Sequence, residues 1–220
     1  MRIATWNVER LKHKSELPSM LNYCMRTKAD ILVLTETDRQ IQPNYKYCFD
    51  THSANNVIPE LYRDTENRVS IYTNYELIKR YETYDRYTAV CVELKTERGN
   101  LIIYGTIMGI FGNREKSYAL DLKRQMEDMQ RLSALGSICV VGDYNCSFED
   151  DYYYTKNGRD IIVDGFRDMG VTVLTGKQLE CIDHIAVSEN YLVGSKVQVS
   201  EWNLDKSLSD HKGIMVEVTW

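Results

Sequence analysis

Five segments of the sequence place a carboxylate, an amide or an imidazole at the edge of an apolar run. They are Asn7 after "RIATW", Glu36 after "ILVLT", Asp143 and Asn145 after "ICVVG", Asp183 and His184 in "CIDHIAVS", and Asp210 and His211 in "LSDHKGIMVEV". Burying one such group without a partner costs about 1–3 kcal/mol, and more if the group is charged. One metal ion and one bound phosphate would provide partners for all five segments. The pattern therefore predicts one shared site that holds a metal ion and a phosphate.

Each of these residues also has a structural explanation, because Asn and Asp at the end of a strand are common turn residues. The recurrence of the pattern along the chain favours a shared site over separate turns. One histidine is set apart from it. Alternation in "IDHIAV" places His184 on the face opposite Asp183, which indicates a structural role. His13 and His52 have no motif around them and receive no role.

The apolar pattern predicts the elements that must position these residues. Strands are expected at Met1–Val8, Asp30–Glu36, Val69–Thr73, Leu77–Tyr84, Thr88–Lys95, Leu101–Thr106, Ile138–Val141, Cys181–Val187, Lys196–Trp202 and Gly213–Trp220, with a weaker signal at Tyr45–Phe49. Helices are expected at Glu16–Lys28, with Ser15 as the N-cap, at Arg114–Leu135 and near Arg159–Met169. The longest helix carries an apolar stripe that indicates core packing, formed by Tyr118, Leu122, Met126, Met129 and Leu132.

This order of elements predicts an α/β fold. The first strand, helix and strand indicate a βαβ-like unit, and "ERGN" at Glu97–Asn100 indicates a hairpin turn. Many strands with few helices favour mixed or antiparallel sheets covered by helices, and two sheets packed face to face would hold all the strands. With 220 residues and no break in composition, we expect a single domain over residues 1–220.

Composition counts against several classes of protein. The net charge of −5 disfavours tight, sequence-independent binding to long nucleic acid, although it is compatible with a locally positive cleft. No run of about 18 apolar residues occurs and the N-terminal segment is polar, so we expect neither a membrane span nor secretion. The six cysteines form no CxxC pair and mostly lie in apolar runs, which indicates buried free thiols. We therefore expect a cytoplasmic protein.

The segments "TWNVER", "LTETD", "VVGDYN", "CIDHIAVS" and "LSDHKGIMVEV" resemble, in this order, the motifs of the endonuclease/exonuclease/phosphatase superfamily, the group with the pancreatic DNase fold. The resemblance extends from Asn7 to His211, and "GDYN" followed by a late "SDH" is its most specific part. It implies a four-layer α/β sandwich, in which two packed mixed or antiparallel sheets are flanked by helices. It also implies Mg²⁺-dependent hydrolysis of a phosphate ester.

The resemblance and the chemistry of magnesium together imply a metal site. Mg²⁺ prefers oxygen ligands and keeps several waters, so one or two carboxylates suffice to hold it. Glu36 is expected as the direct ligand of Mg²⁺ or Mn²⁺. Asn7 is expected to support the metal through its carbonyl oxygen or a bound water, and Asp210 to face the metal side of the site.

The resemblance also implies a catalytic set. Hydrolysis of a phosphodiester needs a positioned water, a base for it and neutralisation of charge at phosphorus. Asp143 is expected to orient and deprotonate the water, and Asn145 to donate a hydrogen bond to the phosphate or to Asp143. His211 is expected to donate to a non-bridging phosphate oxygen. Asp183, 28 residues earlier, is expected to hydrogen-bond to His211, orient it and raise its pKa.

One segment departs from the family pattern. Members usually carry His or Tyr, then Asn, just beyond the strand that corresponds to Leu101–Thr106, whereas this chain has "YGTIMGIFGN". Thr106 takes about this place without an imidazole or a phenol, and Asn113 follows several residues later. Either another residue assists the leaving group, or the rate or the substrate is unusual. Alternation does not decide whether Tyr104 points inward or outward.

The substrate has several candidates. The tyrosines in "EDDYYYTK" could stack on nucleobases or form an ordinary surface loop. The sequence "IDH", where inositol phosphatases of this fold carry a "CDR"-like motif, disfavours that branch. We expect a monomeric phosphodiesterase with no protein partner, a nuclease acting on short or damaged nucleic acid. The alternatives are a phosphatase or phosphodiesterase acting on a small phosphorylated molecule, and a catalytically silent binding module of the same fold.

Overall fold

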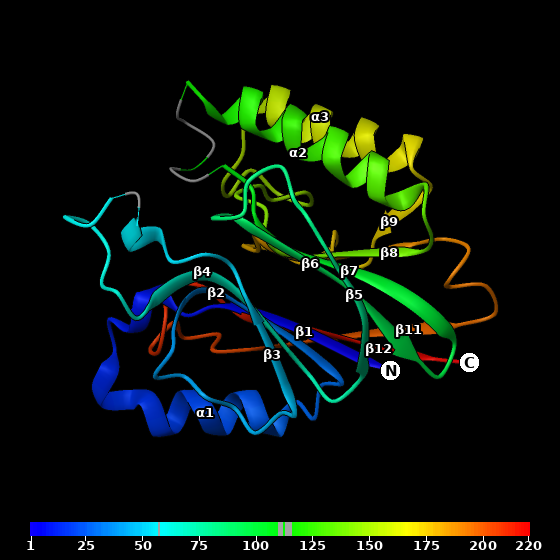
Figure 1. Ribbon diagram of the computed structural model, residues 1–220. Coiled ribbons are helices and arrows are strands. Elements are labelled where there is room, and N and C mark those ends of the chain that lie inside the picture. Colours follow the sequence, from blue (N-terminus) through cyan, green and yellow to red (C-terminus); the bar gives the residue numbers. More distant parts are fainter. Residues whose placement is uncertain (57, 110–111, 113–115) are drawn as a thin grey trace.

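Two six-stranded β-sheets pack face to face, and α-helices cover their outer surfaces (Figure 1). The computed structural model describes the chain except residues 57, 110–111 and 113–115. The first sheet has the strand order β11 (Lys196–Trp202), β12 (Gly213–Thr219), β1 (Arg2–Asn7), β2 (Ile31–Asp38), β4 (Glu66–Thr73), β3 (Tyr47–Asp50). The second has the order β5 (Glu76–Tyr81), β6 (Ala89–Thr96), β7 (Gly99–Ile107), β8 (Ile138–Asp143), β10 (Asp183–Ser188), β9 (Val171–Val173).

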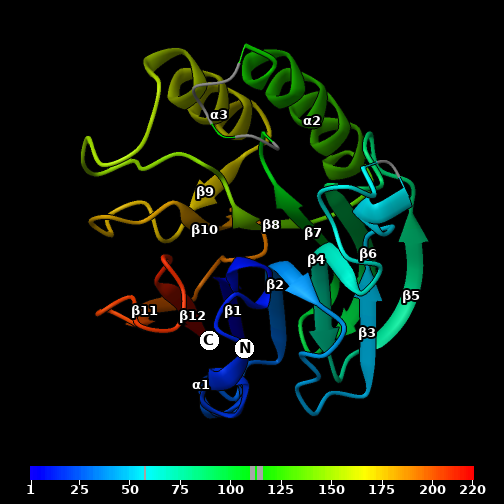
Figure 2. The same ribbon diagram turned by 90° about the vertical axis from the view of Figure 1, so that its left-hand side faces the viewer.

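The helices form the two outer layers (Figure 2). Helix α1 (Leu17–Arg26) lies on the first sheet, whereas α2 (Tyr118–Ser133) and α3 (Lys156–Asp168) lie side by side on the second. Short 3-10 turns occur at Glu9–Leu11, Lys14–Glu16 and Ala54–Asn56. The succession of helix, sheet, sheet and helix confirms the predicted four-layer α/β sandwich.

Both sheets are mixed, as predicted. Strand β1 pairs in parallel with β2, the strand that follows α1, and antiparallel with β12. Strand β7 pairs in parallel with β8, the strand that follows α2. The predicted hairpin joins β6 to β7, with Thr96 opposite Gly99. The first strand, helix and strand therefore do form a βαβ unit.

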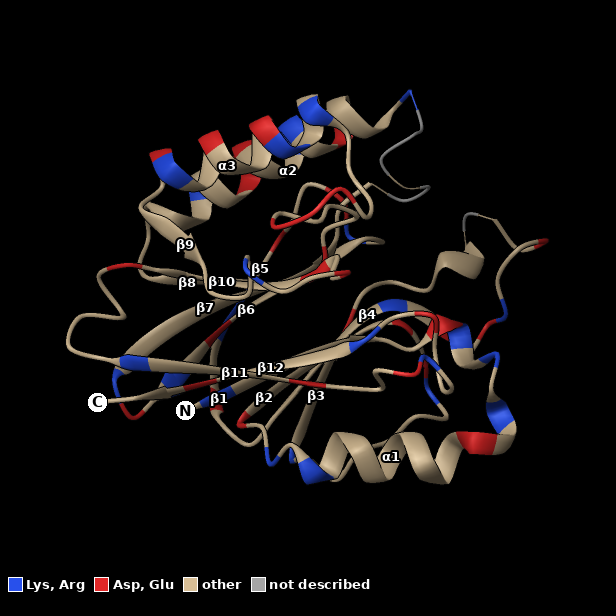
Figure 3. Ribbon diagram, turned by 180° about the vertical axis from the view of Figure 1, so that it is seen from behind, with Lys and Arg blue, Asp and Glu red and all other residues tan. Residues whose placement is uncertain are grey.

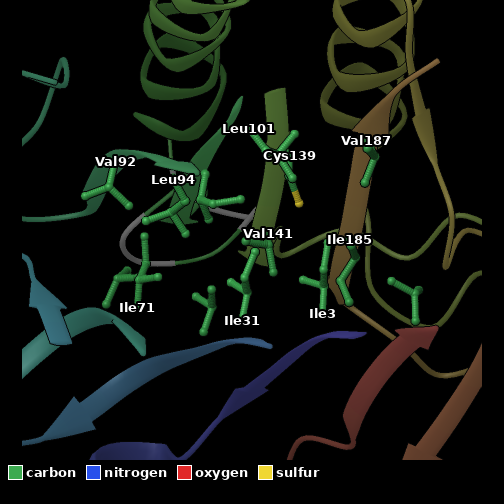
Figure 4. Close-up of a cluster of buried hydrophobic side chains, with 14 of the residues drawn as sticks. Ile3, Ile31, Ile71, Val92, Leu94, Leu101, Cys139, Val141, Ile185 and Val187 are labelled. Carbon is green, nitrogen blue, oxygen red and sulfur yellow. The ribbon is translucent and has the colours of Figure 1, made fainter. Parts of the chain in front are cut away.

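Apolar side chains of both sheets form the central core (Figure 4). Ile3, Ile31 and Ile71 of the first sheet face Val141 and Ile185 of the second, and all five are fully buried. Because successive side chains of a strand point to opposite faces, the intervening residues face the helices. On the second sheet they pack against α2, whose predicted apolar stripe is buried along its length.

Some boundaries differ from the predicted ones. Ser15 does not cap α1, because the residue before the helix is Glu16 and Ser15 lies inside a 3-10 turn. Helix α2 begins at Tyr118, and Arg114, the predicted start, lies outside the described residues. The sequence pattern does not predict β9, because alternation cannot be recognised over three residues.

The cysteines are free thiols, as predicted. The buried ones are Cys24, Cys91, Cys139, Cys146 and Cys181. Cys48, on β3, is exposed. The fold therefore owes its stability to its core rather than to covalent cross-links among these residues.

The outer surface of α2 and α3 carries charges of both signs (Figure 3). Ion pairs there join Arg131 to Asp128, Lys156 to Asp160 and Arg167 to Asp164. This helical face therefore does not form a uniformly basic surface. Among the described helices, none combines the length and the apolar character that crossing a membrane requires.

Gly142 sets the backbone path of β8 immediately before Asp143. Its φ is +138°, and a Cβ there would lie 2.1 Å from the backbone oxygen of Thr106 on β7. We expect Gly142→Ala to lower the free energy of unfolding by about 3 kcal/mol. The added methyl group would collide with the backbone of β7, which cannot move away without breaking its pairing with β8. Gly136→Ala is the control and should change it by less than about 0.5 kcal/mol, since only Ile102 Cδ1 lies nearby, at 3.9 Å. Urea unfolding measures both variants, and equal stabilities would contradict the prediction.

Candidate active site

Two buried carboxylates face each other where β8 ends and β10 begins. The antiparallel register places Asp143 opposite Asp183. Their exposed fractions are only 2% and 1%. Two ionised carboxylates that are paired across neighbouring strands and shielded from solvent repel each other unless cations or hydrogen-bond donors lie beside them. A positively charged group beside Asp143 and Asp183 would therefore be stabilised.

His211 supplies part of that charge. Its Nδ1 lies 2.6 Å from Asp183 Oδ2, which confirms the hydrogen bond predicted between them. Burial alone lowers the pKa of His211, but the neighbouring charge and hydrogen bond of Asp183, aided by Asp143, raise the pKa to about 10. The imidazole is therefore protonated at neutral pH, with Asp183 accepting the proton on Nδ1.

The backbone around His211 is fixed by two side-chain donors. Trp6 Nε1 donates to the His211 carbonyl oxygen at 3.1 Å, and Asn203 Nδ2 donates to the same oxygen at 2.7 Å. Ser209 Oγ donates to the Asn7 carbonyl oxygen at 2.7 Å. These bonds tie the loop before β12 to the end of β1. No sequence motif included Asn203, and Ser209 lies in the SDH motif without a predicted role.

Two amides surround Asp143. Asn7 Nδ2 donates to Asp143 Oδ2 at 3.2 Å, and the backbone N–H of Asn145 donates to Asp143 Oδ1 at 2.8 Å. The side-chain amide of Asn145 donates instead to the carbonyl oxygens of Met108 and Gly109. Burial, with a further contribution from the charge of Asp183, raises the pKa of Asp143 to about 7. Asp143 can therefore exchange a proton near neutral pH.

Glu36 and Asp210 lie at the edge of this cluster. Glu36 follows Thr35, the residue that pairs with Asn7, and it lies near enough to add to the raised pKa of Asp143 after the larger effects of burial and Asp183. The side chain of Asp210 is 66% exposed, and its Oδ1 lies 3.7 Å from His211 Nε2. All seven residues predicted for the site thus lie at one end of the two sheets.

The residues present fit a divalent cation. Among the described residues, one group brings its possible ligand atoms within 4.8 Å of one another, and it consists of Asp143, Asp183 and His211. Its two carboxylates can bind a cation, whereas the protonated imidazole of His211 cannot. Asp183 Oδ1 is buried and has no hydrogen-bond partner. Carboxylate oxygens are the ligands that Mg²⁺ and Mn²⁺ prefer. Glu36 and Asp210 do not belong to this group, so a cation bound by Glu36 would lie outside it.

A cavity of about 290 Å³ opens beside this cluster. Asn145, Asp183 and His211 line it together with Tyr152, Tyr153 and Lys206. Lys206 Nζ donates to the hydroxyl of Tyr152 at 2.9 Å. Tyr154, in contrast, packs against Arg159, whose guanidinium carbon lies 3.5 Å from the centroid of the Tyr154 ring. The three adjacent tyrosines therefore have different surroundings, and two of them border the cavity.

Two described residues of the segment that departs from the family pattern, Thr106 and Tyr104, do not line this cavity. Thr106 is fully buried, and its hydroxyl points to the Thr88 carbonyl oxygen at 3.4 Å. Tyr104 is also fully buried and donates to Asp128 of α2 at 3.1 Å, which settles its direction toward the helices. Asn113 lies outside the described residues.

His184 is a structural residue, as predicted. It is fully buried, with Nε2 3.0 Å from the Cys146 carbonyl oxygen and Nδ1 3.0 Å from Thr175 Oγ1. Because a carbonyl oxygen can only accept, Nε2 carries the proton. Burial lowers the pKa of His184 to about 4, so the ring is neutral at pH 7.

A model of the family described as "Endonuclease/Exonuclease/phosphatase family" matches residues 4–211. This range includes all seven residues predicted for the site. No curated protein sequence matches the chain.

Several solved structures are similar to this one. A 3′ phosphatase, NExo, from Neisseria, bound to a product DNA hairpin, has a TM-score of 0.73 at 17% identity, with 100% of both chains covered. An AP endonuclease from Archaeoglobus fulgidus has a TM-score of 0.74 at 13% identity, also with 100% of both chains covered. The endonuclease domain of TRAS1, a telomere-specific non-LTR retrotransposon, has a TM-score of 0.65 at 14% identity, covering 98% of this chain and 96% of that one. At these identities the likeness shows a shared fold.

Proposed function

The chain belongs to the endonuclease/exonuclease/phosphatase family, and we propose that it is a phosphodiesterase, dependent on Mg²⁺ or Mn²⁺, that cleaves short or damaged nucleic acid. Endonucleases, exonucleases and phosphatases all hydrolyse phosphate esters, so the protein is a metal-dependent hydrolase of that class. One observation supports the proposed phosphodiesterase activity. Asp143, Asp183 and His211 form a buried acid–base cluster that opens into a cavity.

In the proposed reaction, Asp143 accepts the proton of the attacking water. A base is most effective when its pKa lies near the working pH, and burial raises the pKa of Asp143 to about 7. Asn7 and Asn145 hold its two oxygens, so the carboxylate has a fixed orientation. His211, charged through Asp183, donates from Nε2 to a non-bridging phosphate oxygen, where negative charge grows as the bond to phosphorus forms.

We assign the metal to Glu36, with Asn7 and Asp210 in supporting positions. A bound Mg²⁺ or Mn²⁺ ion neutralises charge at the phosphate oxygens. Asn7 Oδ1 already accepts the backbone N–H of Glu9 at 2.9 Å and retains a second lone pair. The side chain of Asp210 is exposed, so it can contact the metal ion through a water molecule.

Two observations favour nucleic acid as the substrate. The neighbouring structures include a phosphatase bound to a DNA hairpin and an AP endonuclease. Tyr152 and Tyr153 line the cavity beside His211, where bases could stack on them. A small phosphorylated molecule is the second candidate, because a cavity of about 290 Å³ is also of a size for a compact ligand.

We also propose a monomer with one domain over residues 1–220, located in the cytoplasm. One core is shared by strands from both sheets, which supports a single domain. The free thiols among its cysteines support a reducing compartment. Gel filtration with light scattering tests the monomer directly.

Metal removal tests the proposed reaction. We expect hydrolysis of a short single-stranded oligonucleotide or of DNA containing an abasic site to require Mg²⁺ or Mn²⁺, and to disappear in EDTA. The far-UV circular dichroism spectrum should stay unchanged, because the core holds the fold without the metal. A panel of DNA, RNA and small phosphoesters, with and without EDTA, measures both. Full activity in EDTA would contradict metal dependence, hydrolysis of small phosphoesters alone would favour the second candidate, and complete inactivity would favour a binding module.

A further inference from the structure

Two lysines line the active-site cavity, and their surroundings differ. Lys212 Nζ lies 2.6 Å from Glu201 Oε1 and donates to the Leu179 carbonyl oxygen at 2.6 Å. Lys206 Nζ donates instead to the neutral hydroxyl of Tyr152 at 2.9 Å. Among the described residues, no carboxylate oxygen lies within 4.0 Å of Lys206 Nζ. Lys206 therefore brings to the cavity a positive charge that no neighbouring carboxylate neutralises at contact distance.

The carboxylates of this cavity lie elsewhere. Asp183 Oδ2 accepts the proton of His211 Nδ1 at 2.6 Å, and Asp210 Oδ1 lies 3.7 Å from His211 Nε2. Glu180, which also lines the cavity, is exposed to solvent, so water screens its charge. Because the ammonium of Lys206 lies more than 4.0 Å from all three of these carboxylates, it lies apart from the acid–base cluster while bordering the same cavity.

Hydrogen bonds of Asn203 hold the loop that carries Lys206. Asn203 Oδ1 accepts the backbone N–H of Leu208 at 3.1 Å, and its Nδ2 donates to the carbonyl oxygens of Ser209 and His211 at 2.9 Å and 2.7 Å. The backbone N–H of Lys206 donates to the Asn203 carbonyl oxygen at 3.0 Å, and the φ of Lys206 is +54°. A non-glycine residue rarely adopts this left-handed conformation unless its surroundings enforce it. The backbone of Lys206 is therefore fixed relative to His211.

Tyr152 orients the ammonium group from a second loop, the one between β8 and α3. Besides accepting a hydrogen bond from Lys206 Nζ, it places the centroid of its ring 4.7 Å from that atom, which is a cation–π contact. An ammonium group has three N–H donors, and the Tyr152 hydroxyl takes one of them. The other two are available to an acceptor in the cavity, and the oxygens of a phosphate form stronger hydrogen bonds with a cation than neutral acceptors do.

We propose that Lys206 determines specificity by binding the phosphate next to the one that is hydrolysed in a nucleic-acid strand. The hydrolysed phosphate is assigned to Asp143 and His211, and Lys206 borders the same cavity beyond that cluster. A molecule with a single phosphate cannot occupy both positions, so Lys206 favours a nucleic-acid strand over a small phosphorylated molecule. This inference rests on the proposed function, which supplies the assignment of the hydrolysed phosphate.

The salt dependence of binding tests this contact without turnover. The probe is a fluorescently labelled single-stranded thymidine octamer with Ca²⁺ in place of Mg²⁺, and fluorescence anisotropy measures Kd over a range of salt concentrations. We expect Lys206→Met to weaken binding by about 10-fold, because a hydrogen bond between two charged groups is lost. The slope of log Kd against log salt concentration should fall by about 0.7, the contribution of one phosphate contact on a single strand. An unchanged affinity, an unchanged slope, or no binding of the octamer by the wild-type protein would overturn the proposal.

Three further variants separate a phosphate contact from a structural role of Lys206. Lys156→Met is the matched control, since it removes one positive charge from a side chain that is 86% exposed and pairs with Asp160, and it should leave affinity and slope unchanged. Lys206→Arg keeps the charge and should keep the wild-type slope. Tyr152→Phe removes the hydroxyl but no charge, so its slope should also stay unchanged. A slope that falls in any of these three variants as it does in Lys206→Met would contradict the phosphate contact.

Kinetics with Mg²⁺ distinguish the neighbouring phosphate from the hydrolysed one. For cleavage of the octamer by Lys206→Met, we expect KM to rise about 10-fold and kcat to stay within about twofold, because the charge of the neighbouring phosphate does not change during the reaction. A fall in kcat of about 100-fold or more would place Lys206 on the hydrolysed phosphate and overturn the assignment. Failure of the proposed function is a separate result, namely that the wild-type protein binds the octamer through Lys206 but does not cleave it with Mg²⁺.

Discussion

Asp183→Asn should lower kcat by about 10²- to 10⁴-fold, the range expected for the loss of a correctly protonated acid–base partner. Asp183 Oδ2 lies 2.6 Å from His211 Nδ1 and is the main reason that the imidazole stays charged. An amide at this position fits the same space but cannot stabilise the cation. Steady-state kinetics measure kcat, and Asp151→Asn, with a side chain that is 82% exposed, is the control and should leave kcat unchanged.

The pH dependence identifies the cause of that loss. In the wild-type protein the pKa of His211 is raised to about 10, so the charged donor persists until the pH rises through that value. Without the carboxylate the pKa falls toward the ordinary value of about 6.5, and the donor is lost at lower pH. The alkaline limb of the kcat profile should therefore move to lower pH in Asp183→Asn. The affinity for Mg²⁺ should be unaffected.

The same two measurements also test whether Asp183 binds the metal instead of charging His211. Asp143, Asp183 and His211 also have the geometry of a cation site. If Asp183→Asn abolished Mg²⁺ affinity and left the pH profile as it was, Asp183 would be a metal ligand. The pairing with His211 would then serve to orient that ligand.

Glu36→Gln should raise the Mg²⁺ concentration that gives half-maximal activity by about 10- to 100-fold, because an amide is a weaker ligand than a carboxylate. The alkaline limb governed by His211 should stay in place, since Asp183 is intact. Titration of activity with Mg²⁺ measures the shift. Glu76→Gln, on the exposed strand β5, is the matched control and should behave as the wild-type protein.

Asp143→Asn distinguishes the two possible metal positions. If Glu36 holds the metal, Asp143→Asn should lower kcat with little change in the Mg²⁺ requirement. A Glu36→Gln variant with an unaltered requirement, together with an Asp143→Asn variant that no longer responds to Mg²⁺, would place the cation between Asp143 and Asp183. The assignment of the metal to Glu36 would then be wrong.

The sequence by itself determined the fold class and the chemical groups of the site. Its apolar periodicity predicted the strands that flank Asp143, Asp183 and Glu36, because periodicity is a local property of a strand. The motifs around Asp183 and His211 also predicted a hydrogen bond across 28 residues, which the structure confirms. The catalytic and metal-binding roles of these residues stay predictions until the variants are measured.

Only the tertiary structure decided which side chains surround those groups. Arg68 lies near the beginning of β4 and carries no motif, yet the pairing of Thr35 with Val69 and of Thr37 with Asn67 places it level with Glu36 of β2. The burial that raises the pKa of Asp143 likewise depends on the packing of one sheet on the other. Strand order, register and desolvation are set by contacts between distant segments. A local pattern can therefore identify a carboxylate at a strand end, but not the cation that stands beside it.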